Sequence, residues 1–120
     1  MRIGELAREA GVTVKAVRYY ESLGLLGAER LGNGYRDFAP TDVRLVREIR
    51  DLASVGVTAE RARPFIECLV AGHQNGSDCP DAVGAFREAL AELDAQITDL
   101  QQRRAAISEL LECAAPAGAR

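Results

Sequence analysis

The sequence of 120 residues has few aromatic, histidine or cysteine residues, and this sets several classes of protein aside. It contains no tryptophan, one histidine and three cysteines, and aromatic residues make up 5% of the chain. There is no CxxC pair, which argues against a zinc knuckle. With one histidine and no glycine-rich phosphate loop there is no catalytic constellation, so we expect a protein that is not an enzyme.

Long apolar runs are also missing. The first residues, MRIGELAREAGV, lack the apolar stretch of a signal peptide, and no segment approaches the roughly 20 apolar residues of a membrane span. We therefore expect a cytoplasmic protein, in a compartment where thiols stay reduced. Three cysteines in such a compartment do not point to a structural disulfide framework.

Charge is distributed unevenly along the chain. The net charge is −3, but residues 1–64 carry 11 Lys and Arg against 9 Asp and Glu, whereas residues 65–120 carry 4 against 9. The first part is therefore +2 and the second −5. Any contact with a nucleic acid is expected in the first part.

Two short helices separated by Gly11 predict a helix-turn-helix at the N-terminus. Apolar residues recur at helical spacing over residues 3–10, and Thr13 can cap a second helix over about 14–22. The second helix would bury Tyr20 and expose a polar face. That face carries Lys15, Arg18 and Tyr19.

A small β-hairpin is expected next. Asn33-Gly34 is the strongest short signal for a hairpin, because a type I′ turn needs positive φ at both central residues. The flanking segments are short, so the hairpin should form a wing rather than part of a larger sheet. Its tip and its strands carry Arg30, Asn33, Tyr35 and Arg36.

The remainder of the chain predicts a second helix pair, a linker and one long helix. We expect a DNA-binding domain over 1–70, a linker over 71–80, a dimerisation helix over 81–113 and a flexible tail over 114–120. Apolar residues of the long helix recur at spacings of three and four, as in a coiled coil. Only one such helix is present per chain, so we infer a homodimer. The expected seam consists of Val83, Phe86, Leu90, Leu93, Ile97, Leu100, Ile107 and Leu111.

These segments, in this order, resemble the MerR family of bacterial transcriptional regulators. The matching stretches are IGELAREAGVTVKAVRYYESLGLL, NGYRDF and DVRLVREIRDLASVGVT, followed by the long helix. The resemblance implies a mainly α fold, with a winged helix-turn-helix and an antiparallel coiled-coil dimer. It also implies a two-fold operator in promoter DNA, which the dimer distorts in response to an effector so that RNA polymerase holoenzyme can engage both promoter elements.

The resemblance also assigns DNA-binding residues by position. Lys15, Arg18 and Tyr19 fall on its recognition helix, and Arg30, Tyr35 and Arg36 fall on its wing; we add Thr13 and Asn33. Lysine and arginine neutralise phosphates, and Arg18 has the geometry to read a guanine in the major groove.

Cys79 and Cys113 are the candidate effector-binding residues. Pro80 suits the first position of a helix, which makes Cys79 its N-cap, where free backbone N–H groups favour a thiolate. A trial antiparallel register places Cys79 opposite Leu111 of the other chain, two residues from Cys113. Metal-responsive members of the family place cysteines at similar positions but continue into a cysteine-bearing loop, and no cysteine follows Cys113 here.

Several interpretations of these thiols remain open. They bind a thiophilic metal ion, with His73 or a carboxylate as a further ligand, or they sense redox state or electrophiles. Alternatively, the cleft between the linker and the coiled coil binds a small organic molecule and the thiols are incidental. In the last interpretation there is no such role, and Cys79 is only a cap and Cys113 only a residue at the helix end. We expect Cys68 to be a buried structural thiol and His73 a surface residue. Two further classes are an effector-free architectural DNA-binding protein and a thiol-based metal buffer.

Overall fold

The computed structural model describes residues 1–27, 29–30 and 36–118 and is mainly helical, as predicted. It divides into two compact units, Met1–Phe86 and Arg87–Arg120. No helix in the described part of the chain is long and apolar enough to cross a membrane. The elements are α1 (Ile3–Ala10), α2 (Val14–Ser22), β1 (Glu29–Arg30), β2 (Arg36–Asp37), α3 (Pro40–Ser54), the 3₁₀ turn η1 (Ala59–Arg61), α4 (Arg63–Val70), the 3₁₀ turn η2 (Gly76–Asp78) and α5 (Pro80–Gly118).

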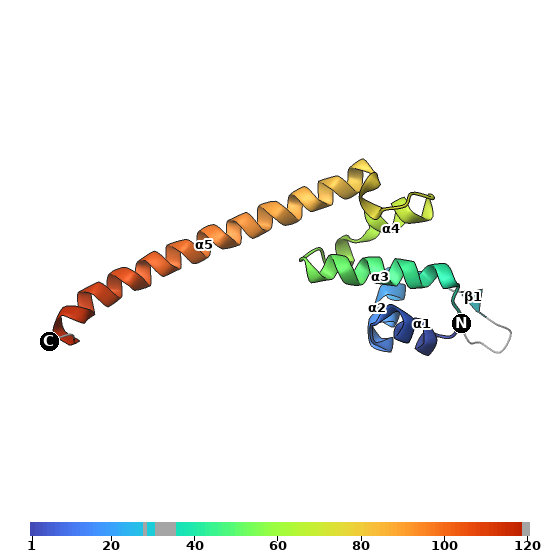
Figure 1. Cartoon of the computed structure of the whole chain (residues 1–120), viewed down its shortest axis with the longest axis horizontal. Helices are drawn as coiled ribbons and strands as arrows, with labels where there is room; N and C mark the ends of the chain where they lie inside the picture. Colours follow the sequence, from blue (N-terminus) through green and yellow to red (C-terminus); the bar gives the residue numbers. More distant parts are fainter. Residues whose placement is uncertain (28, 31–35, 119–120) are drawn as a thin grey trace. The chain divides into compact units, whose positions relative to one another are not determined.

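Helix α3 is the central element of the first unit. It lies between α1 and α2 on one side and α4 on the other (Figure 1). The helix starts at Pro40, and the buried carboxylate of Asp42 accepts a hydrogen bond from the N–H of Ala39 at 2.8 Å, which caps the first turn. Its apolar face packs into a core whose fully buried side chains include Leu6, Val17, Phe38, Val46, Ile49, Val57 and Phe65.

The turn between α1 and α2 is built around Gly11. Its φ of 73° lies in the left-handed region that favours glycine, and its N–H caps the carbonyls at the end of α1. A Cβ at this position would lie 2.8 Å from Nη1 of Arg50. Arg50 and Arg47 of α3 donate to the carbonyls of Ala10 and Glu9, each at 2.8 Å, so α3 satisfies the free end of α1.

Helix α2 forms as predicted from its cap and its apolar spacing. Oγ1 of Thr13 accepts a hydrogen bond from the N–H of Ala16 at 3.0 Å. Val17 and Tyr20 are buried against the rest of the unit. The helix-turn-helix expected from residues 3–22 is therefore present.

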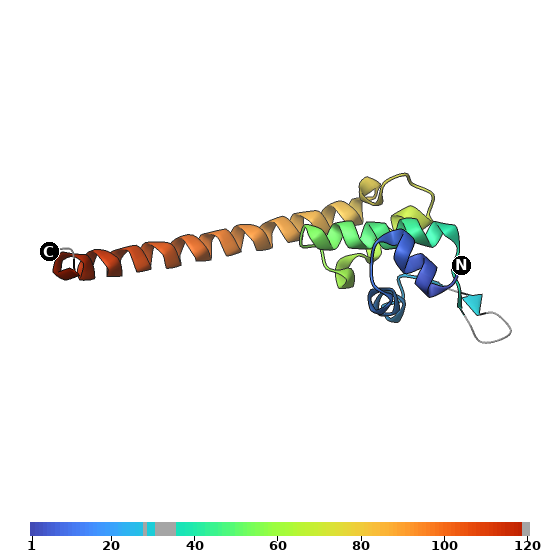
Figure 2. The ribbon, with the colours of Figure 1, turned by 60° about the horizontal axis from the view of Figure 1, so that its bottom comes forward.

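The backbone of β1 and β2 forms a two-residue antiparallel ladder. Glu29 pairs with Asp37 and Arg30 pairs with Arg36. Both views place this ladder near the N-terminus and the start of α3 (Figures 1 and 2). Just after β2, the N–H of Phe38 donates to the carbonyl of Met1 at 2.7 Å, which ties the ladder to the start of the chain. The expected turn residues Asn33 and Tyr35 lie outside the described residues.

Helix α5 is longer than the predicted helix over 81–113. It begins at Pro80 and continues to Gly118, so residues 114–118 of the expected tail are helical. Ala114 and Ala115 have the highest intrinsic helix propensity, and they extend the helix beyond Cys113. Apolar residues of the expected seam are exposed along it, including Leu90, Leu93, Ile97, Leu100, Ile107 and Leu111.

Candidate metal centre and nucleic-acid interface

The exposed face of α2 carries the predicted recognition residues. Lys15 and Arg18 are exposed, and neither side chain forms an ion pair with another described residue. Thr13, also expected to contact DNA, is engaged in capping the helix. The structure thus presents two cations from one helical turn on an exposed face, where they are available to contact phosphates or base edges.

Tyr19 shares this face but has a partner within the chain. Its side chain is 44% exposed, and its hydroxyl donates to the carboxylate of Glu60 in η1. That hydrogen bond raises the pKa of Tyr19 and lowers the pKa of Glu60. A DNA contact through the Tyr19 hydroxyl would therefore have to compete with Glu60.

The predicted contacts of the hairpin are described through their backbone alone. Arg30 and Arg36 are paired across the β1–β2 ladder, and their side chains, like Asn33 and Tyr35, lie outside the described part of the chain. The ladder holds residues 30 and 36 opposite each other. A two-residue turn at Asn33-Gly34 would instead pair residue 30 with residue 37, so the observed register differs by one residue from the one that such a turn predicts.

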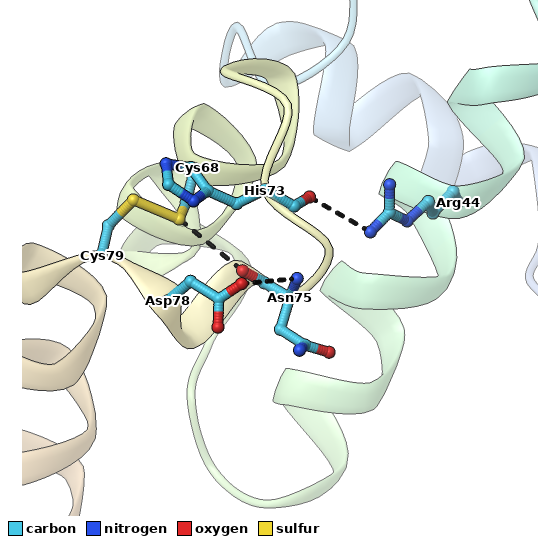
Figure 3. The surroundings of a disulfide bond; sticks show 6 residues. All are labelled: Arg44, Cys68, His73, Asn75, Asp78 and Cys79. Carbon is cyan, nitrogen blue, oxygen red and sulfur yellow. Dashed lines mark hydrogen bonds between the residues drawn. A yellow bond between two sulfur atoms is a disulfide. The ribbon is translucent and has the colours of Figure 1, made fainter.

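Cys68 and Cys79 form a disulfide between α4 and the start of α5. Their Cα atoms are 6.0 Å apart (Figure 3). Cys68 is buried, as predicted, but it is not an isolated thiol. Pro80 begins α5, also as predicted, and the carbonyl of Cys79 accepts from the N–H groups of Ala82 and Val83.

The expectation that the Cys79 sulfur acts as a free N-cap thiolate is therefore wrong for the disulfide-bonded chain. The sulfur is bonded to Cys68, because the segment between α4 and α5 folds back and brings the two residues together. Cys113 is an exposed free cysteine in the second unit. Its expected approach to Cys79 of the partner subunit remains a prediction.

His73 completes a cluster with the two cysteines. One ligand atom from each of Cys68, His73 and Cys79 lies within 4.8 Å of the others, and the imidazole stands beside the two sulfur atoms (Figure 3). Cys68 is buried and Cys79 is partly exposed, whereas His73 lies at the surface, as expected. The sequence predicts a surface position for His73 because it lies in the linker, and it offers this residue only as a possible further ligand to a metal ion.

Backbone contacts hold the loop that carries His73. Gly72 has a φ of 101°, which turns the chain after α4, and the N–H of His73 donates to the carbonyl of Cys68 at 3.3 Å. The guanidinium of Arg44 in α3 donates to the carbonyl of His73 at 3.3 Å (Figure 3). It also donates to the carbonyl of Gln74. The expected linker is thus attached to the central helix of the first unit.

The second half of this loop is held by close packing. A Cβ on Gly76 would lie 2.7 Å from Oε1 of Glu48 and 3.1 Å from the Cβ of Phe65, so only glycine fits without displacement. The carboxylate of Asp78 accepts from the N–H of Asn75 at 3.1 Å and caps η2. Burial and the nearby Asp51 raise the pKa of Glu48, while Arg44 lowers it.

An open groove of about 540 Å³ lies elsewhere in the first unit. It is bordered by α3 and α4 and by the segment after α2, with Leu25, Leu45, Ile66 and Val70 among its apolar lining. None of the three cysteines lines it, so it is separate from the thiol cluster.

Taken together, a helix-turn-helix with an exposed basic face, a short β ladder and a long apolar-striped helix define a DNA-binding transcriptional regulator. The family model for the MerR HTH family regulatory protein matches residues 1–67. The chain belongs to this family.

Curated relatives agree with this assignment. The chain is 33% identical to the HTH-type transcriptional regulator HmrR of Rhizobium leguminosarum bv. viciae, over 92% of this chain and 84% of the relative. It is 30% identical to heavy metal-dependent transcription regulator 2 of Rhizobium meliloti strain 1021, over 92% of this chain and 74% of the relative.

Solved structures share the fold. The transcription regulator PbrR691 of Ralstonia metallidurans CH34, in complex with lead(II), has a TM-score of 0.75 at 24% identity and is matched over 92% of this chain and 84% of its own. HiNmlR, a MerR family regulator lacking the sensor domain and bound to promoter DNA, has a TM-score of 0.57 at 21% identity, over 86% and 76%.

Proposed function

We propose that this MerR-family regulator binds a two-fold promoter operator as a homodimer and changes the shape of the DNA in response to a thiophilic metal ion. By distorting the operator it would control how RNA polymerase holoenzyme engages the promoter. Bending or untwisting a site of this size costs a few kcal/mol, which contacts from both protomers would have to offset.

The observation that carries the DNA-binding part is the exposed face of α2. Lys15 and Arg18 project from a helix whose opposite face is fixed in the core by Val17 and Tyr20. A rigid helix with one basic face is what major-groove recognition requires. In this arrangement Arg18 reads a base edge, Lys15 neutralises a phosphate, and the β1–β2 hairpin acts as the wing that grips the flanking backbone.

The dimer part rests on α5. Its apolar stripe is exposed along the second unit, where Leu100 and Ile107 are 60% and 65% exposed. A stripe with spacings of three and four residues is the pattern of a coiled-coil seam, and a second copy of the same helix in antiparallel orientation would cover it. Two DNA-binding units related by a two-fold axis then fit a two-fold operator.

The effector part rests on the thiols and on the metal-related proteins that the chain resembles. Cys79 stands where α5 begins, bonded to α4 through Cys68 and close to His73. An ion bound there would contact both the DNA-binding unit and the first turn of the dimerisation helix. Thiolate and imidazole ligands favour soft and borderline ions such as Zn²⁺ and Pb²⁺ over Mg²⁺ or Ca²⁺.

DNA binding by titration with a fluorescent promoter fragment tests this proposal. The fragment is first selected by the wild-type chain from randomised two-fold sites. Arg18→Ala should weaken binding by about 10–100-fold and relax sequence preference at one position of each half-site. Arg103→Ala, which removes the same charge from an exposed i,i+4 pair with Asp99 in α5, is the matched control and should bind like the wild type. Equal affinity of the Arg18→Ala and wild-type chains would contradict the assignment of α2.

A second candidate function is favoured by one observation, the Cys68–Cys79 disulfide itself. A bond that forms and breaks between α4 and α5 would make the regulator a thiol redox sensor. Transcription from the selected promoter, measured with peroxide alone and with Zn²⁺ alone, separates the two: a response to peroxide without any response to metal favours the redox sensor.

A further inference from the structure

We infer that Cys68, His73 and Cys79 of a single protomer, with both cysteines reduced, form one binding site for a thiophilic cation, and that the Cys68–Cys79 disulfide is the oxidised form of this site, which excludes the ion. The inference deepens the proposed function, because it places the effector ligands within one chain rather than between Cys79 and Cys113 of the partner subunit.

The ligand atoms are close enough to share one ion. They lie within 4.8 Å of one another. A tetrahedral ion with metal–sulfur distances of about 2.3 Å and metal–nitrogen distances of about 2.0–2.1 Å sets its ligand atoms roughly 3.5–3.8 Å apart. Small side-chain rotations would bring two sulfurs and one imidazole nitrogen to that spacing, with no rearrangement of α4 or α5.

The site is closed on one side and open on the other. Cys68 is 2% exposed in the last turns of α4, whereas His73 lies at the surface of the loop. Three protein ligands with an open fourth position leave room for a water molecule or for exchange with an incoming carrier ligand. An open site suits an ion that must be gained and lost, as a sensor requires.

The disulfide and the bound ion exclude each other. A disulfide holds its sulfur atoms about 2.05 Å apart and has no thiolate, whereas the ion needs two thiolates at roughly 3.7 Å. Cys68 Sγ lies 3.6 Å from the carbonyl oxygen of Asn75 in the disulfide form (Figure 3), so after reduction its S–H would have an acceptor there. Binding a divalent ion then releases the two thiol protons.

The oxidised form arises with hydrogen peroxide as the oxidant. One thiolate attacks a peroxide oxygen, the O–O bond breaks, and a sulfenic acid forms as one water leaves after protonation. The other thiol attacks the sulfenic sulfur, the S–O bond breaks, and the disulfide forms as a second water leaves. The two sulfurs lose two electrons and the peroxide gains them. A dithiol reductant returns the pair to thiols by exchange and is itself oxidised to a disulfide.

Contacts of the loop connect this site to the helix-turn-helix of the same unit. Arg44 of α3 holds the carbonyls of His73 and Gln74, and Gly76 packs against Phe65 of α4. Arg47 and Arg50, further along α3, hold the end of α1. A change in the loop thus reaches the helix-turn-helix through one helix.

Metal binding by the full-length chain, reduced with a phosphine, tests the inference without DNA. Zn²⁺ is titrated against a chromophoric chelator, and Co²⁺ is used as the optical probe of thiolate ligation. We expect one ion per chain in the wild type and in Cys113→Ser. Cys79→Ser should weaken binding at least about 100-fold, since even groups that only support a ligand contribute about 10–100-fold.

His73→Ala gives the same test at an exposed position that does not disturb the core. It should weaken Zn²⁺ binding at least about tenfold, while Gln74→Ala, its exposed neighbour, should leave binding unchanged. Cys68→Ala should remove the thiolate-to-Co²⁺ charge-transfer absorption band. The far-ultraviolet circular dichroism spectrum of this variant should stay that of the wild type. Loss of binding in Cys113→Ser, together with full binding in His73→Ala, would overturn the inference in favour of a site shared between protomers.

Oxidation with peroxide provides a second test of the inference. Peroxide treatment of the wild type should abolish Zn²⁺ uptake, lower the mass by two hydrogens and join the Cys68 and Cys79 peptides in a digest; a dithiol should reverse all three. Uptake that survives formation of this disulfide would overturn the exclusion. A chain that binds operator DNA but no Zn²⁺ refutes this inference alone, whereas a chain that binds Zn²⁺ and no DNA refutes the proposed promoter binding alone.

Discussion

The two units of the molecule use apolar residues in opposite ways. In Met1–Phe86 most large apolar side chains are buried, and Leu6, Ile49 and Phe65 have no exposed surface. In Arg87–Arg120 residues of the same type are largely exposed along α5. The first unit therefore contains its own core, whereas the second presents an apolar stripe that requires another surface. The same residue type stabilises the fold of the first unit and, in the proposed dimer, would stabilise association through the second.

The largest expected effect concerns the buried core of the first unit. Leu6→Ala removes a fully buried side chain and should lower the free energy of unfolding by about 2.7–5 kcal/mol, measured by denaturant unfolding at a concentration where the chain is monomeric. Leu100→Ala, the same substitution at a position that is 60% exposed, is the control and should change it by less than about 0.5 kcal/mol. Equal losses in the two variants would show that both units are packed in the same way.

The next effect concerns association. Ile97→Asp places a charge in the apolar stripe of α5 and should weaken self-association by at least about 100-fold, because the buried carboxylate would lack a partner. Sedimentation equilibrium of the full chain measures it. Ala95→Asp adds the same charge outside the stripe and should associate like the wild type. If the Ile97→Asp chain sediments as the wild type does, the stripe is not the dimer seam.

The smallest expected effect is the contribution of the Glu48 carboxyl group to the dependence of folding stability on pH. Burial, with Asp51 nearby, raises the pKa of Glu48 above its usual value of 4.5, although Arg44 lowers it. A folded-state pKa above the unfolded value means that this group favours the folded state most below pH 4.5, and the benefit is lost as the pH rises through the folded-state pKa.

Glu48→Gln should therefore raise the free energy of unfolding slightly at pH 7, by less than about 0.5 kcal/mol because the group is partly exposed. The difference between the variant and the wild type should shrink as the pH falls toward about 4. Paired denaturant unfolding curves at the two ends of this pH range measure it. A variant that is less stable than the wild type at neutral pH would show that the charge on Glu48 is needed by Arg44.

Local signals explain which features the sequence predicts well. Thr13 as a cap, Gly11 as a left-handed turn and the buried Tyr20 each act within a few residues, so the helix-turn-helix follows from the sequence alone. The same holds for Pro80 at the start of α5. The predicted end of α5 comes too early, because the apolar spacing stops before the helix does.

The thiol cluster does not follow from the sequence in this way. Its geometry depends on the path of residues 71–79, which has no periodic pattern. That path is set by contacts with residues distant in the sequence, such as Arg44 with the loop carbonyls and Glu48 with Gly76. The sequence therefore identifies Cys79 as an important thiol and offers Cys113 and His73 as its companions, but it does not indicate the bond to Cys68.

The contact of Arg44 has a consequence for building new regulators. Its guanidinium binds two carbonyl oxygens of the backbone, at residues 73 and 74. Every amino acid supplies such an oxygen, so the contact depends on the conformation of the loop and tolerates changes in its sequence. A loop with other ligand residues but the same backbone path could be grafted between α4 and α5 and remain attached to the same DNA-binding unit. If the loop holds the effector as proposed, the regulator is a scaffold on which the chemistry of detection can be exchanged while its DNA-binding surface is kept.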